Sequence, residues 1–133
     1  MLNRKILAGL AMSAACLNTF AADIVVIVNP AAPVPSKADV ADLFLGKNPS
    51  LVPIDMVESS PLRGEFYKKV TGRDLNQVSA LWSRVIFTGK GLAPKQMPDA
   101  AAVKKAVAAD PKAVGYIEKS AVDGTVKVAF PAE

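Results

Sequence analysis

Apolar residues along the chain follow two patterns: continuous runs, which are typical of buried strands, and helical spacing. The run DIVVIVNP (residues 23–30) is apolar from its second residue until asparagine and proline end it, which is typical of a strand buried on both faces. Further along, Asp74 and Gln77 can cap a helix whose apolar residues recur at helical spacing. These residues are Val78, Leu81, Trp82, Val85 and Ile86. The pattern predicts a central strand and, later, the clearest helix of the sequence.

The remaining segments continue the alternation of strands and helices. Short helices with caps or stops are expected over 36–46, 61–72 and 99–110. Further strands are expected over 51–57, 113–117 and 125–130, and a loop rich in glycine and proline over 87–98. Pro53 favours a sheet edge or the beginning of its strand, because proline cannot donate a backbone hydrogen bond. With no repeat and no linker, the sequence predicts one α/β domain.

The first 21 residues have the features of a secretory signal peptide. Arg4 and Lys5 precede an uncharged apolar run that extends from Ile6 to Cys16. This run is too short for a permanent membrane helix, which needs about 20 residues. We expect cleavage after Ala21, or one residue later, so that residues 22–133 form a domain in the periplasm. Lipidation of Cys16 is a further alternative, but the leucine usual three positions ahead is missing.

Composition narrows the classes of function. The chain has no histidine, and its one cysteine falls within the predicted signal peptide, so the usual general base, thiol nucleophile and soft metal ligands are missing. Most carboxylates stand at predicted helix starts, where capping explains them. We expect no catalytic residue, no cofactor and no metal. The formal charge of +4 includes two residues of the signal peptide, and the other charges are interspersed, which argues against a nucleic-acid partner.

The stretch VESSPLRGEF (residues 57–66) has the side chains best suited to hold an anion. Ser59 and Ser60 stand at a predicted helix start, where unpaired N–H groups and the helix dipole attract negative charge. Arg63, one turn into the helix, can add charge-assisted hydrogen bonds. Lys47 and Lys90 can add positive charge to the same rim.

A purely structural interpretation of these residues remains open. Ser60 followed by Pro61 is an ordinary N-cap and N1 pair, and Arg63 can be a solvated helix residue. The two lysines can be surface residues that suit helix ends. The sequence also leaves open whether Ser59 or Ser60 is the cap.

The segment VADLFLGKNPSLVPIDMVESSPLRGEF resembles part of the phosphate-binding proteins that serve phosphate ABC transporters, and LWSRVIFTGKG and AVGYI are similar to their short secreted relatives. The resemblance implies a single lobe of the type II periplasmic-binding-protein fold, an α/β lobe whose mixed, mainly parallel sheet is flanked by helices. It also implies that the hydroxyl of Ser60 donates to phosphate. The chain departs from the family at three positions: Met56 replaces an arginine, Pro61 a glycine and Leu62 a threonine.

Two functions are consistent with these observations. The first is a periplasmic solute-binding protein that recognises phosphate or a related oxyanion weakly through Ser59, Ser60 and Arg63, in ABC-type phosphate uptake or sensing. A homodimer can supply the enclosure that one lobe lacks. The second is a non-catalytic interaction module that has lost the ligand and contacts a membrane sensor or transporter component. Weaker anion binding after Ser60→Ala would favour the first function.

Overall fold

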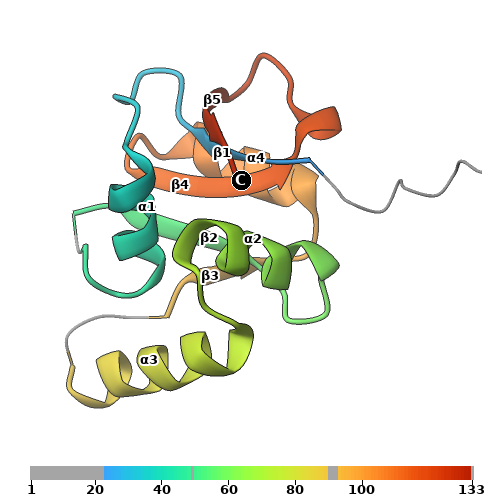
Figure 1. The fold of residues 1–133 in the computed structure, drawn as a ribbon. Helices are drawn as coiled ribbons and strands as arrows, with labels where there is room; N and C mark the ends of the chain where they lie inside the picture. The colour runs from blue at the N-terminus through green and yellow to red at the C-terminus, as the bar shows by residue number, and fades with distance from the viewer. Residues whose placement is uncertain (1–22, 49, 90–92, 133) are drawn as a thin grey trace, which may run out of the picture.

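A mixed sheet of five strands lies at the centre of the fold (Figure 1). The computed structural model describes residues 23–48, 50–89 and 93–132, so the predicted signal peptide and Lys90 lie outside the described residues. The strands are β1 (Ile24–Val28), β2 (Val52–Met56), β3 (Lys95–Met97), β4 (Ala113–Glu118) and β5 (Lys127–Pro131), in the order β3-β2-β4-β1-β5.

The pairing of the strands is half parallel and half antiparallel. β2 is parallel to β3 and β4, whereas β1 is antiparallel to β4 and β5. The expected mixed sheet is therefore confirmed, although its parallel pairs do not outnumber the antiparallel ones. β1 is buried along its whole length between two neighbours, as its apolar run predicts.

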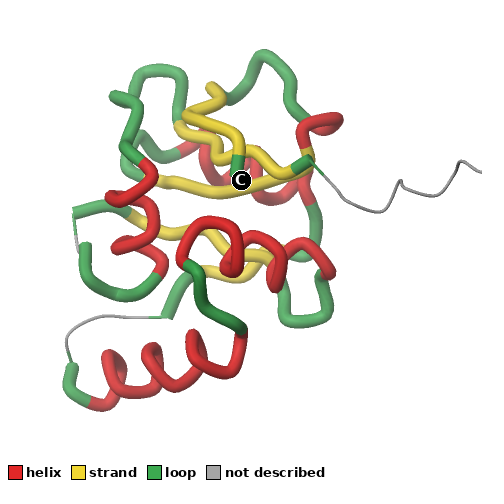
Figure 2. The backbone as a smooth tube through the Cα atoms, viewed as in Figure 1, coloured by secondary structure: helices red, strands yellow, loops and turns green. Residues whose placement is uncertain are grey.

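The helices form layers on both faces of the sheet (Figure 2). They are α1 (Lys37–Phe44), α2 (Pro61–Thr71), α3 (Leu75–Phe87) and α4 (Ala100–Ala109), and a 3-10 turn, η3, covers Lys119–Ala121. α1 and α2 lie on one face of the sheet and α4 on the other (Figure 1). α3 lies further from the sheet and is held partly by Trp82, whose Nε1 donates to the Phe44 carbonyl at 2.8 Å. No helix among the described residues is both long and apolar enough to cross a membrane.

The edges of the sheet differ from the sequence-based expectation at one place. Residues 95–97 were expected to lie in a loop but form β3, which pairs with β2 from Ile54 to Met56. Pro53 lies near the beginning of β2, before this pairing starts, so its missing N–H leaves no gap in the ladder with β3. At the opposite edge, β5 has a register shift against β1 and ends at Pro131.

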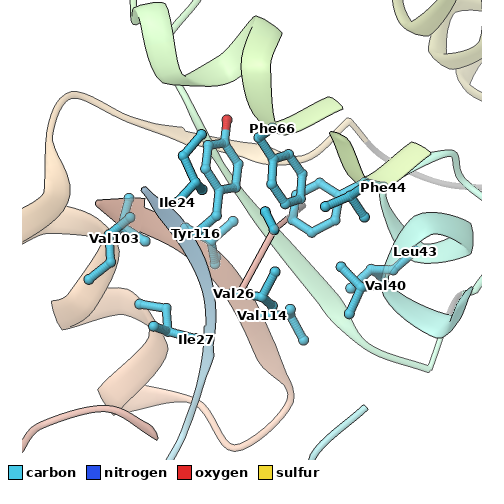
Figure 3. Close-up of a cluster of buried hydrophobic side chains, with 14 of the residues drawn as sticks. Ile24, Val26, Ile27, Val40, Leu43, Phe44, Phe66, Val103, Val114 and Tyr116 are labelled. Atoms are coloured by element: carbon cyan, nitrogen blue, oxygen red, sulfur yellow. The ribbon is translucent and has the colours of Figure 1, made fainter. Parts of the chain in front are cut away.

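An aromatic cluster joins the sheet to α1 and α2 (Figure 3). The rings of Phe66 and Tyr116 are stacked, with centroids 3.8 Å apart and planes at 4°. Phe44 meets Phe66 edge-on at 4.8 Å. All three side chains are fully buried. The cluster therefore fixes where α2, and with it the β2–α2 junction, lies on the sheet.

The close packing of α4 on β4 depends on Gly115. A Cβ added at this position would lie 2.7 Å from Val103 Cγ1 and 3.2 Å from Val107 Cγ2, and both valines are fully buried. We expect Gly115→Ala to lower the free energy of unfolding by about 2 kcal/mol, since the helix must move to admit the methyl group. Urea unfolding measures the change.

Gly124→Ala is the matched control, because a Cβ at Gly124 would meet no atom within 4 Å. Its free energy of unfolding should stay within about 0.5 kcal/mol of that of the unchanged protein. Equal effects of the two substitutions would contradict the close approach at Gly115.

Candidate functional site

The junction between β2 and α2 contains both candidate serines. Ser60 is the N-cap of α2, and its Oγ accepts a hydrogen bond from the Leu62 N–H at 3.3 Å. Its own N–H donates to the Val57 carbonyl at 3.0 Å. Ser59 is exposed and Ser60 is partly buried. Ser60, rather than Ser59, is therefore the cap.

The first turn of α2 uses its own backbone donors. Pro61 has no N–H, Leu62 donates to Ser60 Oγ, and Arg63 donates to the Ser60 carbonyl at 3.2 Å. These are the groups that a helix N-terminus normally offers to an anion. Any anion at this junction must therefore be held mainly by side chains.

Arg63 is buried behind the junction and is not a solvated helix residue. Its side chain is 11% exposed, and its Nε donates to Asp55 Oδ2 at 3.3 Å. The guanidinium carbon lies 5.4 Å from the centre of the Tyr67 ring, within range of a cation–π interaction. The Arg63 side chain also hydrogen-bonds to Tyr67. The ion pair with Asp55 uses Nε, so Nη1 and Nη2 form no ion pair with a carboxylate within the described ranges.

Asp55 is the centre of the polar cluster and was not predicted from the sequence. Its carboxylate is 1% exposed. Oδ1 accepts from the Met56 N–H at 2.8 Å and from the Tyr116 hydroxyl, while Oδ2 accepts from the Tyr67 hydroxyl at 2.7 Å and from Arg63. Four donors satisfy a carboxylate, so its charge is compensated inside the protein. The one available signal was an aspartate within the otherwise apolar stretch LVPIDMV.

The pKa values of both tyrosines in this cluster are strongly raised. Burial raises the pKa of Tyr67 and of Tyr116 far above that of an ordinary phenol, and the Asp55 carboxylate adds to the rise. The positive charge of Arg63 partly opposes the rise of the Tyr67 pKa. The raised pKa values favour the protonated hydroxyls, which donate to Asp55.

Alkaline titration is expected to unfold the protein as its tyrosines ionise. The chain has two tyrosines, both in this cluster, so tyrosinate absorbance reports on the cluster alone. Their contribution to stability is complete below about pH 10, the pKa of a tyrosine in an unfolded chain, and is lost as the pH rises toward the higher folded-state pKa values. Absorbance and circular dichroism should change together. Tyrosinate formation without loss of ellipticity would contradict the buried network.

The other candidate residues are not brought to this junction by the described structure. Lys47 is exposed and lies in the loop between α1 and the beginning of β2, whereas the serines follow the end of β2. A strand of five residues separates these ends by about 17 Å. Lys90 lies outside the described residues. Trp82 is a buried core residue, and the described residues contain no group of three or more potential metal ligands.

Comparison with solved structures identifies the architecture. An ABC-type phosphate transport receptor from Vibrio cholerae matches 80% of this chain with a TM-score of 0.61 and 18% identity. A protein from Clostridium perfringens, described as a phosphate ABC transporter substrate-binding protein and solved with bound phosphate, matches 84% with a TM-score of 0.64 and 17% identity. The chain has the fold of about half of a phosphate-binding protein.

The matched region is about half of each solved structure. The aligned region covers 45% of the Vibrio cholerae chain and 47% of the Clostridium perfringens chain, so this protein spans about half the length of the structures it matches. No protein-family model matches the sequence. A search of curated proteins finds no significant match. The α/β lobe with a mixed sheet, expected from the sequence, is confirmed by the structural match.

Proposed function

We propose that this protein is a periplasmic solute-binding protein that recognises phosphate or a related oxyanion at the β2–α2 junction. The observation that carries the proposal is Arg63, a largely buried guanidinium group in the first turn of α2 whose ion pair with Asp55 uses only Nε, so that Nη1 and Nη2 form no ion pair with a carboxylate among the described residues. The hydroxyls of Ser59 and Ser60 precede it. One of the structures with this fold was solved with bound phosphate, which supports the class of ligand.

The proposed binding is weak. A hydrogen bond to a charged group contributes roughly 1.5–3 kcal/mol, whereas micromolar affinity needs about 8 kcal/mol. The backbone donors of the first turn are already used, so two hydroxyls and one guanidinium group remain. Water and salt weaken contacts in an open site. We therefore expect a dissociation constant in the millimolar range for one copy, and tighter binding if two copies enclose the anion.

The satisfied backbone donors also support a second function. A helix start that bonds to its own cap and carries proline at its first position fits a module that no longer holds a ligand. In this alternative, the protein contacts a membrane sensor or transporter component. The two functions differ in whether inorganic phosphate binds at all.

Isothermal titration of the purified protein with inorganic phosphate, at low and at physiological salt, tests the proposal. Ser59→Ala and Arg63→Gln are expected to weaken binding at least severalfold, because each removes a donor. Ser60→Ala should do the same but also removes a helix cap, which costs about 1 kcal/mol of stability.

Ser36→Ala is the control for Ser60→Ala, because Ser36 is also a serine N-cap, that of α1, and its Oγ accepts from the Asp39 N–H at 3.1 Å. It should lower stability without changing phosphate affinity. The absence of binding heat up to tens of millimolar phosphate would overturn the proposal in favour of the interaction module. A dissociation constant in this range corresponds to a binding free energy of only about 3 kcal/mol.

A further inference from the structure

The Arg63 guanidinium group has two sides with different surroundings. On one side, Nε contacts Asp55 Oδ2 at 3.3 Å and the group lies beside the Tyr67 ring. The side chain also hydrogen-bonds to Tyr67, but on the other side Nη1 and Nη2 form no ion pair with a carboxylate within residues 23–48, 50–89 and 93–132. Helical side chains point toward the helix N-terminus, and the contact of Arg63 Nε with Asp55, near the end of β2, agrees with that direction.

Asp55 is an anion within the protein that already pairs with Arg63. It is the carboxylate of the only ion pair that Arg63 makes within the described residues, and it is 1% exposed. Because the Arg63 side chain is only 11% exposed, water screens its charge less than that of a surface residue, and each charge near it affects its affinity for a further anion. An external anion and Asp55 therefore draw on the same positive charge.

We propose that Asp55 is an internal counter-ion that lowers the affinity of Arg63 for an external tetrahedral oxyanion. This inference rests on the proposed function. It assigns to Asp55 the opposite role from that of an ordinary binding residue, because removing its charge strengthens binding. The donors left for the ligand are hydroxyl and guanidinium groups, which suit phosphate and sulfate alike.

Asp55→Asn separates the charge of this residue from its shape. The amide oxygen keeps an acceptor within the cluster, but the negative charge beside Arg63 is gone. Without an anion, Arg63 becomes a buried charge with no counter-ion, and the folded state loses stability. Phosphate then supplies the missing charge. We expect the variant to bind phosphate about tenfold more tightly than the unchanged protein, and phosphate to raise its melting temperature more.

The experiment compares the unchanged protein, Asp55→Asn and Asp123→Asn by isothermal titration and thermal unfolding with inorganic phosphate or sulfate. Asp123 is the matched control, since its carboxylate also pairs with a cation, Lys104 at 2.8 Å, but on α4 at the opposite face of the sheet. Asp123→Asn should leave the affinity unchanged. Tighter binding of both anions by Asp55→Asn alone supports the inference.

The remaining outcomes separate this inference from the proposed function. Binding by the unchanged protein that is equal or weaker in Asp55→Asn overturns the role of Asp55 but leaves the phosphate site. Absence of binding in both proteins overturns both. If Asp55→Asn is unfolded in dilute buffer, circular dichroism in phosphate and in sodium chloride of equal ionic strength decides. Recovery of the fold in phosphate alone supports the inference, and a chain unfolded in both salts overturns it.

Discussion

Replacing Phe66 with alanine is expected to lower the free energy of unfolding by about 4 kcal/mol. Phe66 is fully buried between the stacked ring of Tyr116 and the edge of Phe44. It therefore joins α2 to β4 and α1 at once, and none of these elements can close the cavity without moving away from the others. Urea unfolding monitored by circular dichroism measures the loss, provided that the denaturant dependence of the free energy stays constant.

Phe87→Ala provides the matched control for this prediction. Phe87 is the same residue type at the end of α3, but it is 91% exposed. Its removal should change the free energy of unfolding by no more than about 0.5 kcal/mol. If the two phenylalanines prove equally important, the aromatic cluster does not hold α2 in the way described.

Removing one partner of the buried ion pair is expected to have a similarly large effect. Asp55→Ala should lower the free energy of unfolding by about 3–5 kcal/mol, because it leaves Arg63 buried without its counter-ion and deprives two tyrosine hydroxyls of their acceptor. Arg63→Met should cost less, because Asp55 keeps its bonds from Met56, Tyr67 and Tyr116.

A double-mutant cycle tests whether these two effects share one cause. Combining Asp55→Ala with Arg63→Met should cost less than the sum of the single substitutions, with a coupling of about 1–3 kcal/mol, because no uncompensated charge is then buried. The unfolding free energies of the four proteins in urea give the coupling. Strict additivity would show that the ion pair does not contribute to stability as a unit.

Local signals made most of the fold predictable. The capping boxes of Ser36 with Asp39 and of Asp74 with Gln77 are both present, and α2 ends at Gly72 with a positive φ of 75°. Each of these features depends on residues within one helical turn. The sequence therefore located four helices and four of the five strands before any tertiary contact was known.

The features that the sequence did not reveal depend on contacts between distant segments. β3 has only three residues, two of them polar, and becomes a strand because β2 lies beside it. An apolar run such as that of β1 carries no sign of strand direction, so the share of antiparallel pairs was missed. Asp55 meets Tyr116 across 61 positions of sequence, and no local pattern indicates this contact. Arg63 was identified as a candidate, but its burial and its internal partner were not.

The two edges of the sheet restrict how copies of this protein can associate. β3 presents only three residues at one edge, and at the other the irregular pairing of β5 and its terminal Pro131 interrupt the row of backbone donors. Short, irregular or proline-containing edge strands disfavour a continuous intermolecular sheet. Any pair of these lobes is therefore expected to meet through side chains, so that the two copies can change their relative angle without breaking backbone hydrogen bonds.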